Sequence, residues 1–92
     1  MSAHAVTRVF EDVEVFFAST RYSFGAYHAN CHGCRASSTN SAQIAGANAA
    51  RKHFEQVCHF YGGNADEYSA LAQISPTTNL VKVTFTRKGG AQ

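Results

Sequence analysis

The segment from residue 41 to residue 61 constrains the fold of this 92-residue chain most strongly, because it has the pattern of one long helix. Apolar side chains recur in it at helical spacing and form a single stripe, made by Ile44, Ala47, Ala50, Phe54, Val57, Cys58 and Tyr61. Asn40 or Ser41 can cap its start, and the glycine pair Gly62 and Gly63 can end it. A helix with one apolar stripe must bury that stripe against a second layer of structure.

The segments on either side of this helix have the composition of strands. β-branched and aromatic residues are frequent in three of them, at residues 6–18, 22–29 and 80–86, with a short turn expected at 19–21. Residues 66–75 fit either a strand or a short helix, and residues 30–40 are expected to form a polar loop. The order β-β-α-β-β predicts an α+β fold of two layers, in which the long helix packs on one face of an antiparallel sheet.

The alternation of side chains predicts which face of each strand is buried. In the last strand, Val81, Val83 and Phe85 are expected to face the helix. In the first strand, Glu14 and Phe16 are expected to lie on the outer face. The inward residues of that strand are then Val9, Val13, Val15 and Phe17.

Length and composition indicate one domain over residues 1–92, with residues 88–92 as a frayed tail. Apolar residues make up 45% of the chain and charged residues 15%, which is too hydrophobic for a disordered segment. No apolar run approaches the roughly 18 residues that a membrane span needs, and the N-terminus lacks the pattern of a secretory signal. A soluble cytoplasmic domain without a membrane partner is therefore expected.

The three cysteines are the residues most suited to metal binding, although their odd number excludes a complete disulfide framework. Cys31 and Cys34 form a C-x2-C pair, and His53 with Cys58 provides two further candidate ligands for one zinc ion. The two end pairs resemble those of CCHC zinc-finger proteins. However, His53 and Cys58 lie about 140° apart around the helix, which opposes joint ligation. The alternative is that the cysteines are unliganded structural residues and that no cofactor is bound.

The remaining chemistry-bearing residues give little support to catalysis. The C-x2-C pair and the later segment around Pro76 loosely resemble thioredoxin-type proteins, but the cysteines do not open a helix directly after a strand. Thiol redox chemistry is therefore a remote alternative. The five histidines form no catalytic grouping with serine, cysteine or aspartate at a recognisable spacing. A non-enzymatic function is expected.

The side of the helix opposite the apolar stripe indicates a binding surface. A solvated helix normally carries several Glu–Lys pairs there, whereas this one carries Ala45, Asn48, Ala49, Lys52, Glu55, Gln56 and His59. Alanines flanked by amide and basic groups would form a flat surface on which a protein or nucleic-acid backbone could lie. Further basic residues assigned to the same partner-binding role are Arg35, Arg51 and Lys82. The alternative is that the alanines are present only as good helix formers.

Side chains around the second expected strand offer another way to bind nucleic acid. Arg21, Tyr22, Tyr27 and His28 are expected to point outward, where they could stack on the bases of a single strand. Half-buried packing within the sheet is the alternative for the two tyrosines.

In size, element order and amide-rich surface, the chain resembles the small phage-encoded inhibitors of bacterial defence. It is most similar to the anti-CRISPR proteins that act on type I surveillance complexes, through the helix of residues 41–61 followed by strands. The resemblance implies a stoichiometric blocker that docks on a CRISPR ribonucleoprotein inside a bacterial host and prevents target DNA from binding. The alternative function is a zinc-stabilised module that binds RNA or DNA directly and unfolds when a chelator removes the metal.

Overall fold

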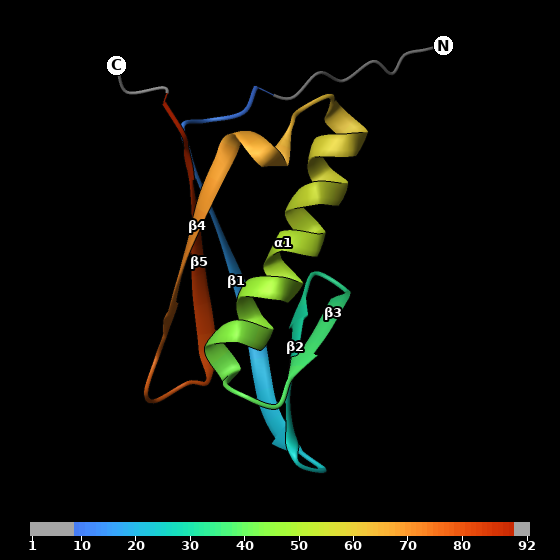
Figure 1. The fold of residues 1–92 in the computed structure, drawn as a ribbon, viewed down its shortest axis with the longest axis vertical. Helices are drawn as coiled ribbons and strands as arrows, with labels where there is room; N and C mark the ends of the chain where they lie inside the picture. Colours follow the sequence, from blue (N-terminus) through green and yellow to red (C-terminus); the bar gives the residue numbers. More distant parts are fainter. Residues whose placement is uncertain (1–8, 90–92) are drawn as a thin grey trace.

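The computed structural model describes residues 9–89, and in these residues a five-stranded antiparallel sheet carries one long helix (Figure 1). The elements in chain order are β1 (Val13–Ser23), β2 (Ala26–Cys31), β3 (Cys34–Ser38), α1 (Ala42–Tyr61), β4 (Tyr68–Ile74) and β5 (Leu80–Arg87). The strand order across the sheet is β3-β2-β1-β5-β4. The predicted two-layer α+β fold is confirmed, with one strand more than the sequence pattern indicates.

β1 is the central strand and belongs to both halves of the sheet. Its first part, from Val13 to Ser19, pairs with β5, and its second part, from Ser19 to Ser23, pairs with β2. β3 and β4 complete the two halves at opposite edges. In Figure 1 the β2–β3 hairpin lies on one side of α1, and β4 and β5 lie on the other, so the helix covers the middle of the sheet.

β1 runs further along the chain than the sequence pattern predicts. The turn predicted at residues 19–21 is wrong, because these residues continue β1 and pair with β2. The chain turns instead at Phe24 and Gly25, whose φ angles are 54° and 78°. Positive φ at both positions is what a tight two-residue hairpin requires.

A second hairpin replaces the polar loop predicted at residues 30–40, and that prediction is also wrong. The segment contains the end of β2, a turn at His32 and Gly33, and all of β3. The two turn residues again have positive φ, of 51° and 91°. Polar side chains in this segment reflect the exposed outer face of a hairpin and not an absence of strands.

The two ends of α1 are capped by the groups that the sequence predicts. The hydroxyl of Ser41 accepts a hydrogen bond from the backbone N–H of Ile44 at 3.0 Å. At the other end, Gly62 has a φ of 84° and its N–H donates to the carbonyl of Cys58. The predicted limits of the helix are therefore confirmed, because local groups determine them.

No helix in the described part of the chain is long and apolar enough to cross a membrane.

Small residues allow α1 to lie close to the sheet. A Cβ atom at Gly46 would lie 2.6 Å from the Cβ of Val81, which leaves no room for a side chain. Further along the helix, Phe54 stacks on Phe85 with ring centroids 4.5 Å apart. Ile44 is exposed although its spacing places it in the apolar stripe. The buried residues of α1 are Ala45, Gly46, Ala49, Ala50, Phe54 and Cys58.

β1 presents to the helix the face opposite to the predicted one. Glu14, Phe16 and Ala18 point inward, because they pair with the inward residues of β5, which are Phe85, Val83 and Val81. The prediction for β5 is thus confirmed and the prediction for β1 is wrong. The residues expected to be inward are exposed, namely Val9, Val13, Val15 and Phe17. The carboxylate of the buried Glu14 accepts a hydrogen bond from the N–H of Glu11 at 2.8 Å.

The segment at residues 66–75, for which the sequence pattern fits either a strand or a short helix, contains the whole of strand β4. A short 3₁₀ turn at Ala65–Glu67 precedes this strand. β5 ends at Arg87, whose guanidinium binds the carboxylates of Asp12 and Glu67 at 2.9 and 3.0 Å. Of the tail expected at 88–92, residues 90–92 lie outside the described residues.

Candidate nucleic-acid interface

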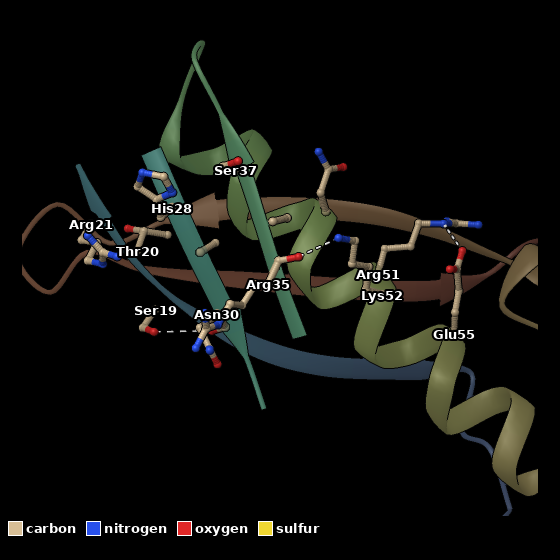
Figure 2. A pocket seen from close by; sticks show the side chains of 13 residues that line it. Ser19, Thr20, Arg21, His28, Asn30, Arg35, Ser37, Arg51, Lys52 and Glu55 are labelled. Atoms are coloured by element: carbon tan, nitrogen blue, oxygen red, sulfur yellow. Dashed lines mark hydrogen bonds and ion pairs between the residues drawn. The ribbon is translucent and has the colours of Figure 1, made fainter. Parts of the chain in front are cut away.

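An open pocket of about 1050 Å³ is lined by side chains of β1, the β2–β3 hairpin and α1 (Figure 2). Its charged lining consists of four cations, a histidine and a carboxylate, namely Arg21, Arg35, Arg51, Lys52, His28 and Glu55. Amides and hydroxyls supply its other polar side chains, from Asn30, Asn48, Ser19, Thr20 and Ser37. We call this surface the basic pocket.

The pairing of the strands determines which face of the sheet contributes side chains to the basic pocket. Arg21 of β1 lies opposite His28 of β2, which lies opposite Ser37 of β3. In the next row, Asn30 lies opposite Arg35. Paired residues of antiparallel strands share a face, so these five side chains belong to the face of the sheet that points away from α1.

The helix side of the basic pocket is held by hydrogen bonds and ion pairs. The Nζ of Lys52 donates to the carbonyl of Arg35 at 2.7 Å, which ties α1 to β3. The guanidinium of Arg51 binds the carboxylate of Glu55 at 3.0 Å and that of Asp66 at 3.1 Å. Figure 2 shows the first of these ion pairs beside the bond from Lys52. The negative charge of Glu55 is therefore already matched by a cation.

Positive charge in the basic pocket remains open to a ligand. Within residues 9–89, neither Arg21 nor Arg35 forms an ion pair with a carboxylate, and both side chains are exposed. The ring of His28 is positioned by a bond of 3.1 Å between its Nε2 and the carbonyl of Ser23. Because a carbonyl only accepts, the histidine donates this bond. A polyanion could contact several of these groups at once.

The structure brings together most of the residues that the sequence assigns to partner binding. Asn48, Arg51, Lys52 and Arg35 all line the basic pocket. Gln56 lines a smaller hollow of about 610 Å³ beside it, to which Arg35 and Lys52 also contribute. Lys82 lines neither hollow. It lies on β5, on the same outer face of the sheet as Arg21 and Arg35.

The surface exposure expected for Ala45 and Ala49 is wrong. Both residues are completely buried and belong to the face of α1 that contacts the sheet. The close approach of the helix at Gly46 requires small neighbours, which explains why alanines occupy these positions. The exposed strip of the helix is therefore narrower and more polar than predicted.

The expected stacking side chains of the first hairpin divide between two faces. Arg21 and His28 lie on the outer face with the basic pocket, whereas Tyr22 and Tyr27 form a cross-strand pair on the other face. The two tyrosine rings pack against each other, with their centroids 4.8 Å apart. The outward direction expected for the two tyrosines is therefore wrong, and of the two only Tyr27 is half-buried, since Tyr22 is 63% exposed.

Sequence reasoning missed the polar residues that the second hairpin adds to the pocket, chiefly Asn30 and Ser37. The sequence pattern predicts a loop there, and a loop does not determine which way its side chains face. The sequence signal for this hairpin is the dipeptide His32-Gly33. Glycine readily adopts the positive φ that a two-residue hairpin turn needs, so a glycine at the second turn position favours such a turn.

The cysteines and His53 do not converge on one site. Cys31 of β2 and Cys34 of β3 lie opposite each other in the second hairpin, and their thiols are free. Cys58 is also free and is buried on α1. The ring of His53 stacks on that of His32 at 4.5 Å and packs against Phe16. Among residues 9–89, no group of three or more Cys, His, Asp or Glu side chains has an arrangement that could hold a metal ion.

The environment of Cys31 makes its thiol difficult to ionise. Burial, and then the negative charge that Cys34 would carry, raise the pKa of Cys31 to about 11 from the ordinary 9.0. Reactive cysteines of thiol oxidoreductases have a lowered pKa, because the thiolate is the nucleophile. The shift at Cys31 is in the opposite direction.

Comparisons with known proteins do not assign this chain to a family. No protein-family model matches it, and no curated protein and no solved structure is significantly similar to it. The chemistry of the basic pocket, and of the sheet face that continues it, is therefore what indicates a function.

Proposed function

We propose that this chain is a non-enzymatic binding protein that docks on a nucleoprotein by contacting phosphate groups at the basic pocket. The observation that carries the proposal is the gathering of Arg21, Arg35 and Lys52 around one open surface, where the one lining carboxylate is paired with Arg51. Contacts to phosphate supply most of the sequence-independent affinity of proteins for nucleic acids.

The neutral groups of the pocket support the same proposal. Asn30 and Asn48 can both donate and accept hydrogen bonds, as contacts to sugars, base edges or peptide groups require. The open form of the pocket suits an extended ligand more than a small molecule, which is normally enclosed on most sides. Binding of this kind requires no chemical step.

The resemblance to small phage-encoded inhibitors suggests a more specific partner. In that version of the proposal, the nucleoprotein is a type I CRISPR surveillance complex, and the bound protein prevents target DNA from engaging. One protein molecule would then inactivate one complex, with no turnover. The same basic pocket would carry the contact, because a ribonucleoprotein contains phosphate groups that its cations could bind.

The test is the affinity of charge-reversal variants for a purified type I surveillance complex and for a labelled 20-nucleotide RNA. Arg35→Glu should weaken binding at least tenfold, and three phosphate contacts predict a slope of about −2 to −3 for log affinity against log salt. Lys88→Glu is the matched control, because Lys88 is exposed and its side chain lies outside the pocket. Equal affinities of the two variants for both ligands would refute the proposal.

A further inference from the structure

The face of the sheet that points away from α1 carries a row of exposed apolar side chains. Val13, Val15 and Phe17 of β1 are 51%, 42% and 53% exposed, and Leu71 of β4 is 60% exposed. Because β4, β5 and the first part of β1 are hydrogen-bonded neighbours in register, Leu71 lies in the same row as Val15. No helix among residues 9–89 covers this face. Apolar side chains that gather on one exposed face mark a candidate binding surface.

The register places an aromatic ring, a cation and an amide side by side on this face. Phe17 of β1 lies opposite Lys82 of β5, and Lys82 lies opposite Gln73 of β4. Directly opposite residues on one face have Cβ atoms about 5 Å apart, so the three side chains can contact a single ligand group. This row adjoins the basic pocket, because Ser19 follows Phe17 on the same face and lines that pocket.

The outer face has positive charge without negative charge. Its strand residues include three cations, Arg21, Arg35 and Lys82, and no aspartate or glutamate in β1 to β5 shares the face with them. The one carboxylate of β1, Glu14, is on the buried face. The apolar row is therefore bordered by cations at Lys82 on one side and in the basic pocket on the other.

This charge distribution decides between a second copy of the chain and a polyanion as the occupant. Two copies packed through this face would bring Lys82 and Arg21 of each near those of the other, with no carboxylate in the strands of the face to match them. Burial of unmatched like charges opposes such a dimer. A nucleic acid supplies phosphates for the cations and flat bases for the aromatic ring.

We infer that the outer face binds a single strand of nucleic acid, with an unpaired base stacked on Phe17 and phosphates contacting Lys82 and the arginines of the basic pocket. The inference rests on the proposed function and extends its surface from the pocket to the open sheet. Phe17 and Arg21 are four residues apart on one strand, which is about 14 Å, so a single strand can reach both. A duplex cannot stack on Phe17, because its bases are paired and stacked internally.

The test compares a labelled 20-nucleotide RNA that cannot pair with itself and the duplex formed with its complement. The natural protein should bind the single strand at least tenfold more tightly than the duplex. Phe17→Ala should weaken binding of the single strand about tenfold, the range of a lost base–aromatic contact, and Phe17→Tyr should bind as the natural protein does. Lys82→Gln should reduce the salt slope by about 0.7, the value of one phosphate contact on a single strand.

Phe24→Asn is the matched control, because it removes an aromatic side chain that is fully exposed at the β1–β2 turn. Asparagine tolerates the positive φ of this position, so the turn is retained. This variant should bind the single strand as the natural protein does. Thermal melting should be similar for Phe17→Ala and Phe24→Asn, which excludes a loss of fold as the cause.

Three results would overturn the inference, and they separate it from the proposed function. Equal affinity for duplex and single strand, with no effect of Phe17→Ala, would show that the sheet face does not bind nucleic acid. If Arg35→Glu still weakened binding in that case, the proposed role of the basic pocket would stand. Failure of the natural protein to bind any nucleic acid or nucleoprotein would refute both the inference and the proposed function. A dimer in solution that Phe17→Ala dissociates would show that a second copy occupies the face.

Discussion

At the scale of single residues, Gly46 sets the distance between the two layers. Its missing side chain brings the backbone of α1 against Val81, and the alanines around it are buried for the same reason. The close contact leaves this end of the core with small residues, whereas Phe54 and Phe85 fill the other end. A larger residue at position 46 would have to push the helix away from β5.

Gly46→Ala should therefore destabilise the protein, although alanine is the better helix former. The gain in helix propensity is about 1 kcal/mol, and the cost of forcing a Cβ atom into this contact is about 1–3 kcal/mol. We expect a net loss of up to about 2 kcal/mol in the free energy of unfolding by urea. In a Val81→Gly background, which removes all three Val81 atoms that lie within 3 Å of the added Cβ, the same change should be less destabilising. A stabilising effect with Val81 present would contradict the close contact.

The raised pKa of Cys31 predicts how stability changes at high pH. The thiol of the unfolded chain loses its proton near its ordinary pKa of 9.0, whereas the folded thiol keeps it until about 11. Deprotonation thus favours the unfolded state, and the stability contributed by the protonated thiol is lost as pH rises from about 9 to 11.

Urea unfolding at pH 8, 9 and 10 measures this effect. The free energy of unfolding should fall more steeply with pH in the natural protein than in Cys31→Ala, which lacks the titrating group. The raised pKa of the buried Tyr68 acts in the same direction and remains in both proteins. Identical pH dependences would mean that Cys31 titrates normally in the folded state.

At the scale of elements, α1 is defined by its own caps and β1 by its partners. Ser41 and Gly62 satisfy backbone groups at the ends of the helix without help from the sheet. β1 has apolar side chains on both faces, so only its pairing with β5 decides which face is buried. One element is therefore set by local chemistry and the other by contacts distant in sequence.

Gly62→Ala tests the cap at the end of α1. No atom lies within 4 Å of the added Cβ, so the cost is the strain of a φ of +84° in a residue with a side chain. This strain is about 1–2 kcal/mol, and 1 kcal/mol lowers the melting temperature of a domain of this size by about 4–8 °C. Gly62→Asn should lower it by less than half as much, because asparagine tolerates this conformation. Equal melting temperatures of Gly62→Ala and the natural protein would contradict a role of the cap.

At the scale of the whole molecule, the two faces of the sheet have different environments. One face is closed by α1 over a core of small and aromatic residues. The other is open, partly apolar and positively charged, and it continues into the basic pocket at the β2–β3 hairpin. The proposed function and the further inference both place the ligand on this second face and its border with the helix.

The sequence alone determined the features that depend on neighbouring residues. The limits of α1 followed from Ser41 and Gly62, and the inward face of β5 followed from the strict alternation around Val83. The two-layer α+β class followed from one amphipathic helix among strand-like segments. These signals are reliable because a cap hydrogen bond or a period of two acts within a few residues.

Only the tertiary structure decided which residues form the site. Both faces of β1 are apolar, so the burial of Glu14 and the exposure of Phe17 follow from the register with β5. Arg35, Lys52 and Arg21 are separated along the chain and meet only because the β2–β3 hairpin packs beside α1. A periodic pattern cannot distinguish two apolar faces, and spacing in sequence cannot report a contact between distant elements.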